Sequence, residues 1–408
     1  MPDILNAIAI DLSSNLFEGV VPSGFTNLVH LYLNDNRFSD SYNILCSQTM
    51  SSLSDLYLSN NLFSGELPDC WMNFIQLSNL HLETNNFSGR IPKSIGTLSN
   101  LHFLDLSNNS FSGSFPAAFQ SLTSLFILNL GYNLFTGYIP AWIGDASQSL
   151  GLLLLYNNHF TGEIPESICQ LNNLQMLDLS INHISGVIPN CIFNFTAMAG
   201  NTDHLLQYFY YSEVMYLGRP ILNIEASETA IVSWKKEEQS FKETLSLTGL
   251  KFLKGFDLSS NELSGEIPNG ILSLTGLKFL NLSNNKLSGY IPLEIGNLTN
   301  LESLDLSSNH LTGNIPISLV EVTWLTTIDV SNNNLSGEIP IGTQLQSFDT
   351  SSYAGNSGLC GAPLPSCPKD RVSSNVPNRD NTSGQDKDND TWIYHWIILG
   401  SLWYLSTI

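Results

Sequence analysis

The sequence predicts a solenoid, in which one short motif repeats along the chain and each copy forms one coil. We expect a right-handed superhelical horseshoe, with a parallel β-sheet on its concave face and 3-10 or loop segments on its convex face. Three observations predict this fold: a motif that recurs twelve times, a nearly constant step between its copies, and a charged fraction of only 12%. An island of unrelated sequence interrupts the coils after the eighth copy.

The motif reads L-x-x-L-x-L-x-x-N-x-(L/F)-(S/T)-G-x-(I/L)-P, and its asparagine marks each copy. Most copies follow each other at a nearly constant step, and one much longer step separates Asn182 from Asn261. Eleven copies also have the glycine and the proline, whereas the second copy has Asp40 and Asn43 in their places. The marking residues are Asn15, Asn36, Asn61, Asn85, Asn109, Asn133, Asn158, Asn182, Asn261, Asn285, Asn309 and Asn333.

Each residue type in the motif has a physical reason. In the last copy Leu325, Ile328 and Val330 point inward from a short strand, and Asp329 points outward because side chains alternate along a strand. One coil cannot bury its own apolar face, so stability comes from stacking on neighbours. We expect the asparagines to form a ladder of side-chain bonds to backbone groups. Breaking one rung should cost ~1–3 kcal/mol. Glycine permits the bend, and proline suits an extended segment.

The composition excludes several classes of function. Thirty-six acidic residues against 15 lysines and arginines give a formal net charge of −21. Nucleic-acid binding and polybasic membrane-surface binding both depend on lysine and arginine, so neither fits this chain. The apolar fraction of 42% is too high for a disordered protein.

The motif pattern divides the chain into six parts. We expect eight coils in 1–195, an island in 196–248, four coils in 249–345, a C-terminal cap in 346–368, a polar juxtamembrane stalk in 369–391 and a partial transmembrane-like segment in 392–408. The last segment is shorter than the ~20 residues that a membrane span needs. Met1 falls within a coil, and no signal peptide is visible. We therefore interpret the sequence as a fragment of a longer protein or as a shortened gene product.

Several stretches resemble the extracellular leucine-rich repeats of plants. The copies LDLSSNHLTGNIP (Leu304–Pro316) and LDLSNNSFSGSFP (Leu104–Pro116) are close to the consensus of that family. The island end WKKEEQSFKETLSL and the cap YAGNSGLCGAPLPSC (Tyr353–Cys367) resemble the plant receptor-like proteins, which lack a kinase domain. The resemblance implies a single-pass glycoprotein on the extracellular face of the plasma membrane, working with co-receptor and adaptor receptor kinases.

The six cysteines fall into three pairs. Two pairs lie about one coil apart, and equivalent residues of adjacent coils are ~5 Å apart, which is within disulfide reach. The third pair lies in the segment that resembles the family's cap. Six cysteines allow 15 connectivities, so buried free thiols stay an alternative. The expected disulfides are Cys46–Cys70, Cys169–Cys191 and Cys360–Cys367.

The outward strand positions are where we expect a ligand to bind. Coils nine to twelve repeat Asp or Asn and Ser there, whereas coils two to eight have large side chains. Aromatic residues exposed on a rigid sheet are typical contact anchors. The alternatives are simple drift of the repeats, or packing of the island on this stripe. The candidate ligand-binding residues are Tyr32, Tyr57, His81, Glu83, Phe103, Tyr132, Leu154, Tyr156, Met176, Tyr208, Tyr210 and Tyr211, with Ile127 and Ile181 in the same stripe.

The sequence contains none of the metalloprotease, hydrolase, nucleotide-binding or kinase motifs. We therefore expect no enzyme activity, no cofactor and no metal site. The aspartates that recur on the strands should help to order the turns rather than form catalytic pairs. The N-x-[ST] sequence also occurs at Asn281, which projects from the strand face, where a glycan would block any partner. We expect this site to be unoccupied or to mark a region where nothing binds. The glycosylation candidates are Asn86, Asn108, Asn194, Asn297, Asn334, Asn381 and Asn389.

These observations favour a receptor-like protein that binds an extracellular peptide, protein or glycan. The ligand would be a defence or developmental signal, bound through the concave face and the island and relayed by partner receptor kinases. One alternative is a secreted binding inhibitor of the polygalacturonase-inhibitor type, against which the island and the membrane-like tail count. Another is a truncated product that does not signal. No nucleic-acid partner is expected, and membrane contact depends on a full anchor.

Overall fold

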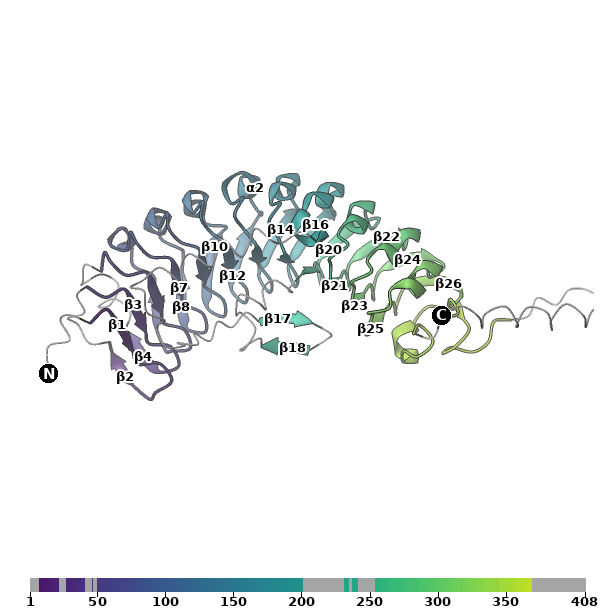
Figure 1. Cartoon of the computed structure of the whole chain (residues 1–408), viewed down its shortest axis with the longest axis horizontal. Coiled ribbons are helices and arrows are strands. Elements are labelled where there is room, and N and C mark those ends of the chain that lie inside the picture. The colour runs from purple at the N-terminus through teal and green to yellow at the C-terminus, as the bar shows by residue number, and fades with distance from the viewer. Residues whose placement is uncertain are drawn as a thin grey trace, which may run out of the picture. The chain divides into compact units, whose positions relative to one another are not determined.

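The computed structural model describes residues 7–21, 27–40, 46, 50–200, 231–234, 237–240, 254–342 and 344–368. In these residues each copy of the motif forms one coil (Figure 1). A regular coil has a short strand, a turn, a second strand and a short helix that leads to the next coil. All of these elements belong to one unit of the chain, Met1–Cys367.

The first strands of the coils form one parallel sheet, as the sequence predicts. Each strand pairs with those of the neighbouring coils, for example Leu80 with Leu56 and Leu104. The sheet continues across the long step, because Leu177 of β15 pairs directly with Phe256 of β19. Its twelve strands are β1 (Ala9–Asp11), β3 (His30–Tyr32), β5 (Asp55–Tyr57), β7 (Asn79–His81), β9 (Phe103–Asp105), β11 (Ile127–Asn129), β13 (Leu152–Leu154), β15 (Met176–Asp178), β19 (Gly255–Asp257), β21 (Phe279–Asn281), β23 (Ser303–Asp305) and β25 (Thr327–Asp329).

A second parallel sheet, which the sequence reasoning did not predict, forms just after the ladder asparagines. The L/F-S/T-G segment of each motif is extended here and pairs with the same segment of the next coil, as Gly289 does with Leu311. Its eleven strands are β6 (Ser64–Glu66), β8 (Asn86–Gly89), β10 (Ser110–Ser114), β12 (Leu134–Gly137), β14 (His159–Glu163), β16 (His183–Val187), β20 (Glu262–Gly265), β22 (Lys286–Tyr290), β24 (His310–Gly313), β26 (Asn334–Glu338) and β27 (Gly358–Cys360).

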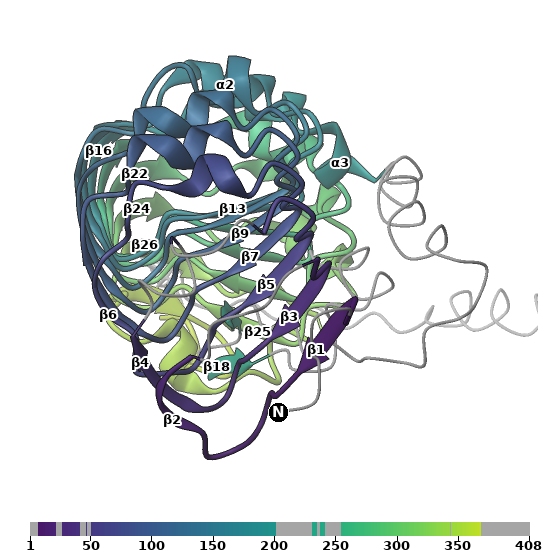
Figure 2. The ribbon, with the colours of Figure 1, turned by 90° about the vertical axis from the view of Figure 1, so that its left-hand side faces the viewer.

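Short helices close the coils along the edge between the two sheets (Figure 2). Most of them begin after the motif proline, whose fixed φ suits an extended residue before a helical turn. They are η2 (Trp71–Asn73), η3 (Lys93–Thr97), η4 (Ala117–Ser121), α2 (Ile143–Ala146), η5 (Glu166–Gln170), η6 (Asn190–Asn194), α3 (Thr196–Ala199), η7 (Asn269–Ser273), η8 (Leu293–Asn297), η9 (Ile317–Glu321) and η10 (Thr350–Tyr353). Two further strand pairs are β2 (Glu18–Val20) with β4 (Arg37–Asp40), and β17 (Ile231–Trp234) with β18 (Glu237–Ser240).

The core runs between the two sheets as one continuous cluster. Its N-terminal half contains a column of phenylalanines from the second to the seventh coil, at the L/F position of the motif, and Phe17 of the first coil, which is 45% exposed, ends the column outside the core. Successive rings are stacked with centroids 6.0–6.5 Å apart. From the eighth coil onward Ile184 and then leucines fill the same place. The column consists of Phe17, Phe38, Phe63, Phe87, Phe111, Phe135 and Phe160.

The ladder asparagines bond as the sequence predicts. Asn285 is typical: its Nδ2 donates to the carbonyl oxygen of Leu258 in the preceding coil at 2.9 Å and to that of Leu282 in its own coil at 3.2 Å. Its Oδ1 accepts the backbone N–H of Leu263 at 3.0 Å. A thirteenth rung, which the sequence reasoning missed, lies in the cap. Asn356 donates to the Val330 carbonyl oxygen at 2.9 Å and so continues the ladder beyond the last motif.

The residue before each ladder asparagine adopts a left-handed conformation, with φ between 49° and 58° in all twelve coils. Serine, asparagine and aspartate tolerate this region, whereas β-branched and aromatic residues are strained there. Three coils depart from the small polar types with Thr84, Tyr132 and Ile181. The twelve residues are Ser14, Asp35, Asn60, Thr84, Asn108, Tyr132, Asn157, Ile181, Ser260, Asn284, Ser308 and Asn332.

Disulfides join the three pairs of cysteines that the sequence spacing and the resemblance favour. The Cα atoms of Cys46 and Cys70 are 5.8 Å apart, those of Cys169 and Cys191 are 5.7 Å apart, and those of the cap pair are 4.8 Å apart. No cysteine of the described residues is free.

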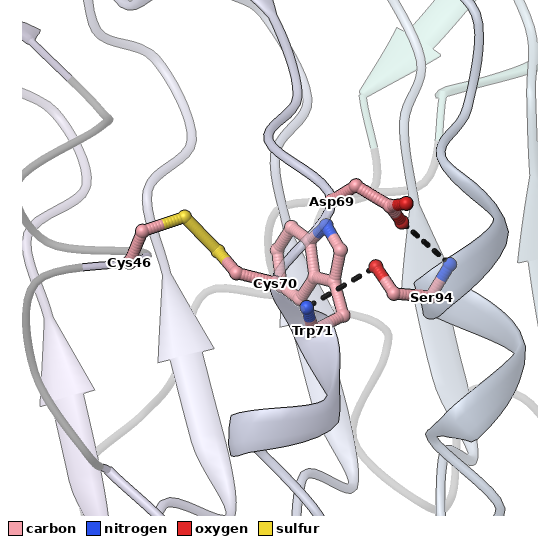
Figure 3. The surroundings of a disulfide bond; sticks show 5 residues. All are labelled: Cys46, Asp69, Cys70, Trp71 and Ser94. Atoms are coloured by element: carbon pink, nitrogen blue, oxygen red, sulfur yellow. Dashed lines mark hydrogen bonds between the residues drawn. A yellow bond between two sulfur atoms is a disulfide. The ribbon is translucent and has the colours of Figure 1, made fainter.

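The first disulfide adjoins a bonded junction between two coils (Figure 3). Ser94 N–H donates to Asp69 Oδ1 at 2.8 Å, and Ser94 Oγ accepts the backbone N–H of Trp71 at 3.2 Å. Hydrogen bonding by the Ser94 side chain, and then by its backbone N–H, lowers the pKa of Asp69. The Trp71 ring is fully buried and packs on Phe74. The coil after the disulfide is thus fixed to its neighbour by side-chain bonds as well as by the sheets.

Within the described residues, no helix has the length and apolar character needed to cross a bilayer. The transmembrane-like segment 392–408 and the stalk 369–391 lie outside those residues.

Candidate functional site: the strand face

The strand face consists of the side chains that point away from the core on the first sheet. They come from the first and third residue of each strand and from the second residue after it. Because the strands are in register, equivalent side chains form columns across the coils. The face therefore presents ordered rows, and its character changes along the chain.

At the N-terminal end, four aromatic rings from neighbouring coils form a stack. Tyr57 lies between Tyr32 and His81, with ring centroids 4.9 Å and 4.0 Å away. His81 in turn stacks on Phe103 at 4.1 Å. Beside the stack, His81 Nδ1 lies 3.5 Å from Glu83 Oε1. Tyr32 is half-buried, and the other four residues are buried. The rings therefore present edges rather than whole faces.

The middle of the strand face is an apolar cluster separate from the main core. Phe103 links it to the aromatic stack, and the half-buried Tyr132 packs against it. Tyr156 lies edge-on to Tyr132, with centroids 5.3 Å apart. Every full member is at most 6% exposed. The members are Phe103, Phe126, Ile127, Leu152, Leu154, Tyr156, Met176 and Phe279.

Glycines of the neighbouring coils make room for the rings of this cluster. A Cβ atom on Gly151 would lie 2.2 Å from Phe126 Cε2, and one on Gly255 would lie 1.7 Å from Phe279 Cζ. A Cβ on Gly131 would lie 2.3 Å from the Tyr156 ring. The rings can therefore lie along the sheet because the backbone beneath them has no side chain.

This burial corrects part of the sequence interpretation. We expected Tyr57, His81, Glu83, Phe103, Leu154, Tyr156 and Met176 to be exposed ligand anchors, and the structure buries all seven. Stacking between large residues of adjacent coils contributes to this burial, as it does for Tyr57 and His81, whose ring centroids are 4.0 Å apart. Tyr32 and Tyr132 are half-buried, while Ile181 is 48% exposed. Tyr208, Tyr210 and Tyr211 lie outside the described residues.

Buried carboxyl groups occupy the third strand position in several coils. Asp105 accepts the N–H of Ser107 at 2.8 Å and the Asn129 amide at 2.8 Å. Asp178 accepts both the N–H and the hydroxyl of Ser180, at 3.0 Å and 2.6 Å. These bonds to the residue two positions on order the turn, as the sequence interpretation holds.

Burial raises the pKa values of three of these carboxyls. The pKa of Asp105 is about 7, through burial and then the charge of Glu83. The pKa of Asp178 is about 8, through burial and then the charge of Asp257, its direct partner on the next strand. Burial also raises the pKa of Asp257, to about 6. Burial also raises the pKa of Tyr156 well above its ordinary value, so this hydroxyl stays protonated.

Among the residues that the structure describes, Ile181 is the one large apolar side chain that combines an outward position, wide exposure and backbone strain. Its φ of 53° lies in the left-handed region, which a β-branched residue adopts at a cost of ~1–2 kcal/mol. Eight residues in the equivalent column are asparagine or serine, which avoid most of this strain. Strain of this kind often marks a functional position. Sequence reasoning placed Ile181 in the stripe but could not see its conformation.

The other candidate residues are distributed as follows. Asn281 is half-buried, donating to Asp257 Oδ2 at 3.0 Å and accepting from the Ser283 hydroxyl at 2.8 Å. No group of three or more His, Cys, Asp or Glu in the described part of the chain is placed to hold a metal ion. The exposed glycosylation candidates are Asn86, Asn108, Asn194, Asn297 and Asn334, and Asn381 and Asn389 lie outside the described residues.

Comparison with known protein families shows which kind of repeat the chain contains. Two models, both described as leucine-rich repeat, match the chain, one over residues 75–135 and the other over 52–74, 149–171, 173–195, 252–274, 276–298, 300–321 and 324–344. Together they cover more than half of it. Receptor-like protein EIX2 of Solanum lycopersicum is 52% identical over 388 residues, which are 93% of this chain and 36% of that protein.

The chain belongs to the plant leucine-rich-repeat receptor-like proteins.

It spans about a third of the length of that relative. Solved structures agree on the fold of this receptor-like chain. The Arabidopsis receptor kinase HAESA ectodomain, in complex with an N-terminally extended IDA peptide hormone, is 32% identical with a TM-score of 0.69, covering 90% of this chain and 53% of that one. HAESA in complex with IDA and the co-receptor SERK1 is 32% identical with a TM-score of 0.67, covering 88% and 50%.

Proposed function

We propose that this chain is the ligand-recognising part of a cell-surface receptor-like protein, that its ligand is an extracellular peptide, and that partner receptor kinases relay the signal. The observation that carries the proposal is the contrast along the strand face. At the third strand position and two residues further on, coils nine to twelve repeat Asp or Asn and Ser, whereas coils two to eight have the aromatic stack and all of the apolar cluster except Phe279 of coil ten. The same ladder and sheets support both halves, so the fold itself does not require this difference.

The solved structures support a peptide ligand and a co-receptor. HAESA binds a peptide hormone in one structure and a peptide with a co-receptor in another, and both share this fold. Recognition of this kind needs no chemical turnover, and we propose that this chain is not an enzyme. We also propose that it acts on the extracellular side of the plasma membrane.

Tyr132 and Ile181 are the best-placed contact residues in the proposal. Both lie in the left-handed column at the border of the strand face, two coils apart. Ile181 is 48% exposed and Tyr132 is half-buried beside the apolar cluster. A peptide backbone lying across the coils could cover these side chains without displacing the buried rings.

A peptide-display experiment tests the proposal. The secreted, disulfide-bonded chain is immobilised and panned with a random peptide library, and enriched peptides are titrated against two variants. The Tyr132→Asn/Ile181→Asn variant receives the residue that other coils have in this column. The Ser308→Asn variant is the matched control in coil eleven.

We expect the enriched peptides to lose about tenfold in affinity for the double variant, which is ~1.4 kcal/mol, and to bind the control unchanged. Equal affinity for all three proteins would contradict the proposed site. Failure of any peptide to enrich on the wild-type chain would contradict a peptide ligand.

A further inference from the structure

An exposed aliphatic stripe crosses the last three coils at the residue that follows the motif proline. From the third to the ninth coil this position is polar or small, whereas the last three coils have Leu293, Ile317 and Ile341. These side chains are 74%, 69% and 73% exposed, so none of them contributes to the core. The earlier residues are Asp69, Lys93, Ala117, Ala141, Glu166, Asn190 and Asn269.

The stripe lines a groove of about 780 Å³, which we name the C-terminal groove. Its walls are the segments 290–293, 313–317 and 338–341, including the motif prolines. Tyr290, at 69% exposed, forms one end. Exposed apolar surface that spans several coils is typical of an interaction site rather than of an ordinary surface.

The groove lies apart from the strand face. Its segments begin at the last residues of β22, β24 and β26, which belong to the second sheet. In Figure 2 these strands lie on the opposite side of the coils from β3, β5 and β7. A partner in the groove would therefore not occupy the strand face.

The charge around the groove selects the kind of partner. Of its thirteen lining residues only Glu338 is charged, and Glu294 is exposed next to Leu293. No lysine or arginine lines it. An apolar partner with a basic border complements this surface. A second copy of the chain does not, because both surfaces would be acidic and each copy has a net charge of −21.

The spacing of the stripe selects the shape of the partner. Adjacent coils are ~4.8 Å apart, so the three aliphatic side chains fall at ~0, 5 and 10 Å along the groove. Residues i, i+3 and i+7 of an α-helix rise by ~4.5 and 10.5 Å and match these positions. Alternate residues of a strand rise by ~6.8 and 13.6 Å and are out of step at the third coil.

We propose that the C-terminal groove binds an amphipathic helix of a partner protein that has an aliphatic i, i+3, i+7 seam flanked by lysine or arginine. The helix lies along the coils, with its seam against Leu293, Ile317 and Ile341 and its basic side chains near Glu294 and Glu338. This surface is a second interaction site, distinct from that of the ligand.

A synthetic helix tests the proposal on the full chain. The probe is an alanine-based peptide of about 15 residues, with leucine at i, i+3 and i+7 and lysine on both flanks. A scrambled peptide of the same composition has no seam. The test variant is Leu293→Ser/Ile317→Ser/Ile341→Ser. The matched control, Leu134→Ser/Val187→Ser, removes apolar side chains that are 48% and 59% exposed in other coils.

We expect the seam peptide to bind the wild-type chain and the control variant equally, and to bind the triple variant at least about tenfold more weakly. Unchanged melting temperatures would show that all variants fold. Equal binding of the seam peptide to the triple variant, or of the scrambled peptide to the wild type, would overturn the proposal because only net charge would then attract the helix.

Two further outcomes would assign the groove to a different occupant and would also overturn the proposal. The first is a wild-type dimer in sedimentation that the triple variant abolishes. The second is binding of wild-type chain, but not of the triple variant, to neutral phosphatidylcholine vesicles. Neither measurement depends on a strand-face ligand, so the result is separate from the test of the proposed function.

Discussion

Replacing one ladder asparagine should weaken the solenoid by far more than replacing an exposed asparagine. Asn285 is only 7% exposed, and its Oδ1 is the acceptor for the Leu263 N–H. In Asn285→Ala that N–H stays buried without a partner, which costs ~1–3 kcal/mol. Loss of the Nδ2 bond to the Leu258 carbonyl oxygen adds about 1 kcal/mol. We expect a total of about 3 kcal/mol.

The matched control is Asn300→Ala. Asn300 is exposed, and its side chain makes one bond, to the Thr275 carbonyl oxygen at 2.8 Å. Its loss should cost at most about 1 kcal/mol, because water can replace it.

Hydrogen exchange is the appropriate assay, because a repeat array opens locally and each coil depends on its neighbours. A loss of about 3 kcal/mol corresponds to roughly 100-fold faster exchange. We expect this increase in peptides covering coils nine to eleven of Asn285→Ala, and little change in coils three to five. Similar exchange rates in Asn285→Ala and Asn300→Ala would refute the reasoning, because the ladder bonds would then contribute no more than a surface bond.

Three further predictions concern the strand face. Gly151→Ala should lower the melting temperature, because the new Cβ would lie 2.2 Å from Phe126 and overpacking costs ~1–3 kcal/mol. A second change, Phe126→Leu, should restore part of the lost stability. An unchanged melting curve of Gly151→Ala would show that the Phe126 ring is not held against Gly151. Ile181→Asn should stabilise the chain by about 1 kcal/mol in chemical denaturation, because asparagine tolerates a φ of 53°; a destabilised variant would mean that packing of the isoleucine outweighs its strain. The chain should melt at a lower temperature at pH 8 than at pH 5, because Asp178 has a pKa of about 8 in the folded state against ~3.9 when unfolded. The stabilising contribution of protonated Asp178 is complete below pH ~4 and is lost as the pH rises through 8. Asp178→Asn should therefore flatten the dependence of melting temperature on pH. The same pH dependence in both proteins would contradict the raised pKa of Asp178.

The sequence was sufficient to predict the coils because every coil buries equivalent residues through the same contacts with its neighbours. The asparagine, the apolar strand positions and the glycine each act within one motif or with the next motif along the chain. The paired strands β15 and β19 show how strong this rule is, since Leu177 pairs with Phe256 although the whole island lies between them in the sequence. The pairs Cys46–Cys70 and Cys169–Cys191 follow from the same stacking, whereas the pair Cys360–Cys367 was expected from the resemblance of the cap.

Features that depend on conformation rather than on residue type were missed. The second sheet pairs through backbone groups, and the motif Ser or Thr adds a bond to the glycine carbonyl oxygen of the preceding coil, as Thr312 Oγ1 does to Gly289 at 3.1 Å. The recurring S/T-G dipeptide was therefore the available signal. The left-handed residue before each asparagine is most often asparagine or serine, which also suits an exposed turn. The cap rung at Asn356 has the ladder bonds without most of the motif, and its position about one motif length after Asn333 was the available signal.

The exposure of the strand face could not be predicted because it depends on pairs of residues in different coils. An outward position in one motif is open or covered according to the size of the side chain one strand away. Phe126 lies flat where the next coil has Gly151, and Phe279 does so over Gly255. A large residue one coil away from a glycine at the adjacent strand position therefore indicates, from the sequence, a side chain that packs over that glycine and is buried. Positions without such a partner, such as Ile181, are those at which a ligand can still reach the side chain.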